Sequence, residues 1–343
     1  MTERPADASD LRVLPDFADS RAVTESILFE VRRVIVGQDA MLERVLVGLV
    51  AGGHVLLEGV PGLAKTLTIR TLADVIGGTF RRIQFTPDLV PSDLVGTRIY
   101  RPDRAEFDTE LGPVFANILL ADEINRAPAK VQSALLEVMQ ERHVTIGHTT
   151  HAVPDPFLVL ATENPIEAEG TYPLPEAQVD RFLLKVKVGY PSPAEEAEIV
   201  GRSIGRTMPP RRILDAAGVK TLQTSVDDVY VDPRIVRYAV TLVDATRRPA
   251  RWGLDDLGAA IAYGASPRGS IGLVHAARAL ALLRGRRYVV PGDVAELAPD
   301  VLRHRLVLTY AGLADGVNAD DVVASVLRAV PVPHLEVAME PTA

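Results

Sequence analysis

The stretch LLEGVPGLAKT, residues 56–66, has the residue types of a phosphate-binding loop. Such a loop wraps phosphate oxygens with backbone N–H groups at the start of a helix, and glycines open the backbone for that approach. Gly59 and Gly62 fit this role. The Lys65 ammonium can reach the β and γ phosphates, and the Thr66 hydroxyl can ligate Mg²⁺. A Gly-Pro turn before an amphipathic helix would explain the glycines but not the Lys-Thr pair.

One position departs from the usual loop pattern, because Ala64 stands where that pattern has glycine. Glycine is required only where φ is positive or where another backbone approaches very closely. We therefore expect Ala64 to have a helical backbone conformation, which tolerates the extra methyl group.

A second group of chemically useful residues is the pair of carboxylates that ends the apolar segment NILLADE, residues 117–123. The carboxyl ends of parallel strands form the ligand-binding edge of a sheet. Asp122 would share Mg²⁺ with Thr66, and Glu123 would orient or deprotonate an attacking water. A simple acidic cap after a strand would need only one carboxylate.

Three further polar residues depend on the first two groups for their interpretation. Asn164 ends the apolar segment FLVLATEN, so it would bond the γ-phosphate or the water if its strand lies between the other two; alone, it would be an ordinary turn residue. Arg181 precedes the last apolar strand and can act across a subunit boundary. Ser266 and Pro267 would start a helix that carries Arg268 toward the γ-phosphate.

These residues need a scaffold of alternating strands and helices, which the apolar pattern predicts. Short apolar strands at 54–59, 80–85, 115–122, 157–164 and 182–188 are separated by helices at 65–77 and 127–142 and by a long loop at 84–113. This pattern is typical of a parallel sheet covered on both faces. Helical segments follow at 194–204, 233–246, 267–283 and 291–306. We expect a tail over residues 1–20, an αβα core over 21–190, and a smaller helical domain with a C-terminal tail over 191–343.

Composition restricts the function. The 343 residues carry a net charge of −8, which argues against a generally basic nucleic-acid surface, and they include no cysteine, which excludes thiolate chemistry. The acidic N-terminal segment is not a secretory signal, and the most apolar stretch is broken by AGGH. We expect a cytoplasmic protein without a membrane span.

Together, VIVGQ, GVPGLAKT, LLADEINRAP, ATENP, LPEAQVDRF and GASPRG resemble the motifs of the MoxR family of AAA+ ATPases, over roughly residues 22–330. The resemblance implies a P-loop AAA+ αβα core with a parallel sheet, an all-helical lid, bound ATP and Mg²⁺, and a ring of subunits, often a hexamer. It also implies a chaperone-like role on a client protein, in some members one with a von Willebrand factor A-type domain. Alanine at position 64 is common in this family.

Carried over by position, the resemblance implies a role for each motif residue. Glu123 activates water, Asn164 is the first sensor, Arg181 is the finger that acts on the neighbouring subunit, and Arg268 is the second sensor. Residues 84–113 match the family's insertion in the second core helix and would face the pore or the client. Arg126 is a candidate for the subunit boundary. The nucleotide-binding residues are Val36, Gly37, Gln38, Gly59, Pro61, Gly62, Leu63, Ala64, Lys65, Thr66 and Asp122, of which Thr66 and Asp122 hold the metal.

Several alternatives remain at this level. His143, His148 and His151 lie in an alternating run, which favours an exposed hairpin over a metal site because no cysteine or carboxylate accompanies them. A nucleic-acid motor would use the same core but requires a basic pore, and a nucleotide-gated scaffold would bind ATP with little turnover. The sequence does not decide between ATP and GTP.

Overall fold

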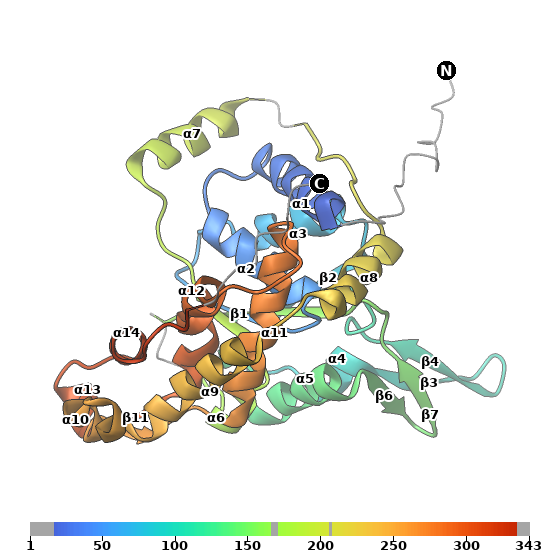
Figure 1. The fold of residues 1–343 in the computed structure, drawn as a ribbon. Coiled ribbons are helices and arrows are strands. Elements are labelled where there is room, and N and C mark those ends of the chain that lie inside the picture. Colours follow the sequence, from blue (N-terminus) through green and yellow to red (C-terminus); the bar gives the residue numbers. More distant parts are fainter. Residues whose placement is uncertain (1–16, 166–170, 206–207, 335–343) are drawn as a thin grey trace. The chain divides into compact units, whose positions relative to one another are not determined.

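The computed structural model describes residues 17–165, 171–205 and 208–334 (Figure 1). Contacts divide the chain into two compact units, residues 1–229 with 282–287, and residues 230–281 with 288–343. The sequence suggested a change at residue 190, whereas the contacts group α7 (Pro193–Ile204) and α8 (Ala216–Ser225) with the first unit. Most of the expected tail at 1–20, and the C-terminal residues 335–343, lie outside the described residues.

The centre of the first unit is a five-stranded parallel sheet with the order β2-β5-β8-β1-β9. Its strands are β1 (Val55–Glu58), β2 (Phe80–Gln84), β5 (Ile118–Asp122), β8 (Leu158–Glu163) and β9 (Leu184–Lys187). The strand that leads to Asn164 therefore lies between the loop strand and the acidic strand, as the sequence interpretation required. All three central strands are apolar and buried on both faces, which is what helices on both sides of a parallel sheet demand.

Helices cover both faces of this sheet (Figure 1). On one side α5 (Ala129–Glu141) buries Val131 and Leu135 against Leu119 and Ala161. On the other side lie α1 (Phe17–Arg32), α2 (Asp39–Val50) and α3 (Lys65–Val75). Helix α1 begins at Phe17, so residues 17–20 are helical and do not belong to an unstructured tail.

The segment expected as a long loop, residues 84–113, is largely regular, and that expectation was wrong. It holds the short helix α4 (Pro91–Val95) and an antiparallel hairpin of β3 (Gly96–Arg101) and β4 (Glu106–Leu111). The hairpin is mostly exposed, and the Tyr100 and Phe107 rings meet across it with centroids 5.2 Å apart. Because few of its side chains are buried, the segment has little of the apolar alternation by which strands are recognised.

The histidine-containing run forms the expected hairpin, β6 (His143–Ile146) and β7 (Thr149–Ala152). The short helix α6 (Glu176–Val179) precedes Arg181.

The second unit is mainly helical. Its long helices are α9 (Pro233–Arg247), α11 (Pro267–Leu283), α12 (Pro291–Leu302) and α14 (Ala319–Ala329), with the shorter α10 (Asp255–Gly258) and α13 (Tyr310–Ala314). It also contains one small antiparallel pair, β10 (Ile261–Tyr263) with β11 (Val307–Leu308), so it is not purely helical. No helix in the described ranges combines the length and the apolarity needed to cross a membrane.

Candidate functional site

The phosphate-binding loop connects β1 to α3, as the sequence predicts. Gly62 has a φ of 86°, which suits glycine in an open loop. The Lys65 ammonium folds back and donates to the carbonyl oxygen of Gly59 at 2.5 Å. Burial lowers the pKa of Lys65, and the Asp122 and Glu123 carboxylates oppose that shift. The loop thus places a buried cation near two acids, at the amino end of a helix where anions bind.

Ala64 corrects the reasoning from the sequence. Its backbone is left-handed, with φ 55° and ψ 18°, and not helical as expected. A side chain at positive φ costs roughly 1 kcal/mol through the contact of Cβ with the following carbonyl. The loop therefore has alanine at a position whose backbone conformation favours glycine.

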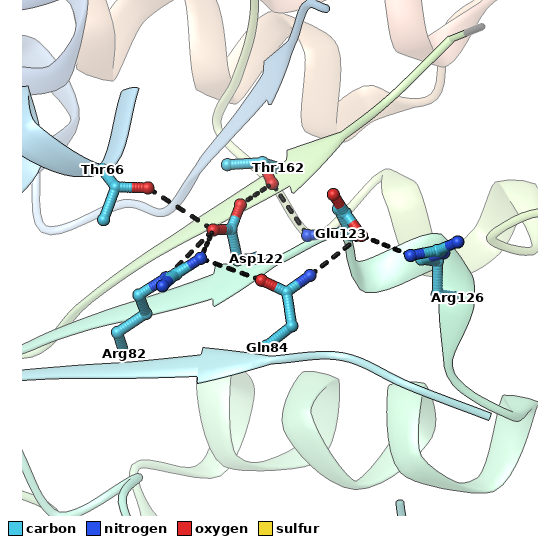
Figure 2. Close-up of polar contacts among 7 residues, drawn as sticks. All are labelled: Thr66, Arg82, Gln84, Asp122, Glu123, Arg126 and Thr162. Carbon is cyan, nitrogen blue, oxygen red and sulfur yellow. Dashed lines mark hydrogen bonds and ion pairs between the residues drawn. The ribbon is translucent and has the colours of Figure 1, made fainter. Parts of the chain in front are cut away.

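The paired acids lie opposite this loop, at the carboxyl end of β5 (Figure 2). Asp122 Oδ2 is 3.4 Å from the Thr66 hydroxyl, and Asp122 Oδ1 accepts a 2.6 Å hydrogen bond from Thr162. Thr162 in turn accepts the backbone N–H of Glu123 at 2.8 Å. A hydroxyl and a carboxylate oxygen converging in this way form the kind of hard, oxygen-rich donor set that Mg²⁺ prefers. Thr66 and Asp122 therefore fit a magnesium ion.

Two residues of β2 that the sequence interpretation missed contact these acids. Arg82 donates to Asp122 Oδ2 through Nη2 at 2.7 Å and Nε at 3.1 Å. Its Nη2 also donates to Gln84 Oε1 at 2.9 Å, and the Gln84 amide donates to Glu123 Oε2 at 2.8 Å. Parallel pairing of β2 with β5 sets Gln84 beside Asp122 in register, so knowing the strand order would have revealed both residues.

Arg126, a candidate for the subunit boundary, contacts the candidate base of its own chain, and its place at a boundary stays a prediction. Its Nη1 lies 3.1 Å from Glu123 Oε2, within the short 3₁₀ turn Ile124–Arg126. Glu123 itself has a φ of 55°. Among non-glycine residues of the described ranges, those with positive φ include Gln38, Ala64 and Glu123, and such conformations often mark functional sites.

Asn164 follows β8 and is 5% exposed. It shares one pocket of ≈ 390 Å³ with Lys65, Thr66, Asp122 and Glu123. The complete lining is Pro61, Gly62, Leu63, Ala64, Lys65, Thr66, Leu67, Arg82, Gln84, Asp122, Glu123, Thr162 and Asn164. Gly59 contacts this lining through its carbonyl oxygen, which accepts a hydrogen bond from Lys65. The structure therefore gathers the phosphate loop, both acids and the candidate first sensor in a single polar cavity.

An ion cluster joins the three neighbouring strands β8, β1 and β9. The Lys185 ammonium of β9 lies 2.7 Å from Glu58 and 3.2 Å from Glu163, which are the last residues of β1 and β8. Burial would lower the pKa of Lys185, but the Glu163 and Glu58 carboxylates outweigh it and the pKa is raised. The cluster therefore links Glu58, which directly precedes the phosphate-binding loop, to Glu163, which directly precedes Asn164.

A second, more apolar pocket of ≈ 300 Å³ adjoins the loop. It is lined by Val34, Ile35, Val36, Gln38, Gly62, Leu63, Ala64, Leu67, Pro191, Ile199, Arg202 and Ser203. Val36 and Gln38 were expected beside the adenine, and Gly37 lies between them with a φ of 67°. The contribution of Ile199, Arg202 and Ser203 from α7 could not be read from the sequence. An apolar slot next to a polar phosphate cavity matches the two halves of a nucleotide.

The two remaining arginines belong to different units, Arg181 to the first and Arg268 to the second. Arg181 lies in a separate pocket with Glu137 and Glu141 of α5, and its Nη1 donates to the Leu136 carbonyl at 2.9 Å. Arg268 stands at the start of α11 in the second unit, where its N–H donates to the Ser266 hydroxyl at 3.2 Å. The expected helix start is confirmed, while the roles of both arginines stay predictions.

Comparison with known proteins agrees with this geometry. Residues 54–184 match the model of the ATPase family associated with various cellular activities, and residues 257–326 match the AAA lid domain. Chaperone MoxR1 of Mycobacterium tuberculosis is 62% identical over 91% of this chain and 82% of its own length, and Protein MoxR of Methylorubrum extorquens is 32% identical over 97% and 99%. A solved Cytophaga hutchinsonii structure, described as a candidate ATPase, is 46% identical, covers 93% of this chain and 97% of its own, and has a TM-score of 0.88. The chain belongs to the MoxR family of AAA+ ATPases.

Proposed function

We propose that this protein hydrolyses ATP with Mg²⁺ at the boundaries between subunits of a ring, expected to be a hexamer, and uses the cycle to remodel or activate a client protein. The observation that carries the proposal is the single cavity in which Lys65, Thr66, Asp122, Glu123 and Asn164 meet. The membership in a family that includes a named chaperone supports the chaperone-like role.

Each residue of the cavity has a task that its position allows. The loop N–H groups and Lys65 bind the phosphates, while the apolar slot beside Leu67 holds the base. Thr66 and Asp122 hold Mg²⁺, which when bound neutralises charge on the phosphate oxygens. Glu123 accepts a proton from the attacking water, and Asn164 fixes that water or the γ-phosphate.

Arg181 and Arg268 complete the proposal from outside the cavity. Arg181 lies in a different pocket of the same chain, which suits an arginine that serves the nucleotide of a neighbouring subunit. Arg268 begins a helix of the second unit, where it can report the γ-phosphate to the lid. The client, for which a von Willebrand factor A-type domain is one candidate, would respond to lid motion.

Mixing two inactive variants tests the shared site. Glu123→Gln lacks the base and Arg181→Ala lacks the finger, and each alone should turn over ATP far more slowly than the native protein. If Arg181 acts in trans, an equal mixture rebuilds complete sites, and random exchange predicts about a quarter of the native rate. A mixture that stays as inactive as its components would overturn the interfacial site. Native turnover per subunit should also rise with protein concentration.

A further inference from the structure

Arg82 occupies the oxygen of Asp122 that a metal ion must reach. Thr66 contacts Asp122 at Oδ2, so a cation held by both residues binds that oxygen. Arg82 already places two N–H groups on Oδ2, at 2.7 and 3.1 Å (Figure 2). The other oxygen, Oδ1, accepts the Thr162 hydroxyl at 2.6 Å. A carboxylate offers about four lone-pair positions, two on each oxygen, so the three donor contacts to Oδ2 from Thr66 and Arg82 already use both positions on that oxygen.

The two partners differ in their freedom to move. The Arg82 side chain is 47% exposed, whereas that of Asp122 is 12% exposed. Arg82 projects from β2, the outermost strand next to β5, so its long side chain can turn into water while Asp122 stays fixed. The charges also favour exchange, because a divalent cation replaces one positive charge with two beside adjacent carboxylates.

We propose that Arg82 is a positioning residue that holds Asp122 Oδ2 in the metal-free protein and is displaced from it when a divalent cation binds. This inference rests on the proposed metal site at Thr66 and Asp122. Displacement also removes the Arg82 donor from Gln84 Oε1, whose amide holds Glu123. Metal binding is thereby linked to the residues around the candidate base.

Metal binding itself provides the test. Mn²⁺ is titrated into the protein with saturating ADP, and the free ion is followed by its electron paramagnetic resonance signal. Arg82→Gln removes the competing cation and should bind Mn²⁺ roughly three- to tenfold more tightly than the native protein. Arg81→Gln removes the same charge from the neighbouring position, whose side chain points to the opposite face of β2, and should match the native affinity. Arg82→Lys keeps the charge without the two-point contact and should fall between.

The outcomes separate this inference from the proposed function. If the native protein binds Mn²⁺ and Arg82→Gln binds it with the same or lower affinity, the displacement is overturned but the metal site is not. Equally tightened Mn²⁺ binding by Arg81→Gln also overturns the displacement, because the loss of any nearby positive charge would then explain the result. No Mn²⁺ binding by any of the four proteins overturns both the displacement and the metal site.

Discussion

The Gln84 side-chain amide donates a 2.8 Å hydrogen bond to Glu123 Oε2. Arg126 contacts the same oxygen at 3.1 Å from the following turn. One oxygen of the candidate base is therefore held from two directions, by the neighbouring strand and by the base's own loop. Such support fixes a catalytic group before substrate arrives, which is how an active site avoids reorganisation during the reaction.

Replacing Ala64 by glycine should stabilise the protein. At a φ of 55° the Cβ of Ala64 lies too close to the following carbonyl, which destabilises the folded state. Glycine removes that contact, although it also gives the unfolded chain more conformational freedom. We expect the free energy of unfolding in urea to rise by up to about 1 kcal/mol. Ala22→Gly is the control, because Ala22 is exposed within α1, where glycine should cost about 1 kcal/mol. Equal destabilisation by both substitutions would contradict the left-handed conformation.

The apolar pocket should bind the base and not the phosphates. Ile199 lines this pocket and not the phosphate cavity, and it is 40% exposed, so a bound base would cover its side chain. Ile199→Ala should weaken ATP and ADP binding by roughly three- to tenfold, as expected for about 1 kcal/mol of lost apolar contact. Binding of inorganic tripolyphosphate should be unchanged, and Leu313→Ala, an exposed leucine of the second unit, should change neither. A comparable loss for tripolyphosphate would show that the pocket does not hold the base.

His54 should make stability depend on pH. Burial, helped by the positive charge of Arg142, lowers the pKa of His54 to about 3, although its contact with the Met139 carbonyl opposes this. The unfolded histidine has a pKa of about 6.5, so below that pH the unfolded state takes up a proton that the folded state refuses. The contribution of His54 to the free energy of unfolding is therefore complete above about pH 6.5. It falls as the pH drops toward 3, by up to about 1.4 kcal/mol per pH unit.

The matched variant is His54→Gln, since an amide can also donate to Met139 O and accept from the Val159 N–H. Urea unfolding at pH 7, 6 and 5 should show a steeper loss of stability in the native protein than in the variant. Parallel losses would mean that His54 does not resist protonation in the folded state.

Much of the architecture was readable because it depends on local patterns. The apolar strands, the loop between β1 and α3 and the helix that starts at Pro267 follow from residue spacing and caps. The β3–β4 hairpin was missed because its exposed polar residues have no apolar alternation. Arg82 was missed because its contact with Asp122 is set by pairing between strands, and sequence spacing gives no information on which strands are neighbours.

Ala64 shows a different limit. Its presence in the loop was correctly accepted, but for the wrong reason, since the backbone is left-handed and the strain is tolerated. Residue type indicates which conformations are easy, whereas the surrounding fold decides which one is adopted.

Turnover by Glu123→Gln tests the central claim most directly. The amide keeps the size of the side chain but cannot accept a proton, so ATP binding should persist while Mg²⁺-dependent hydrolysis falls by roughly 10²–10⁴-fold. Both quantities are measured on the same preparation, above the concentration at which native turnover per subunit is constant. Retained binding with lost turnover is the result that this account predicts. Hydrolysis by the variant at the native rate would contradict it, because the cavity would then not be where ATP is cleaved.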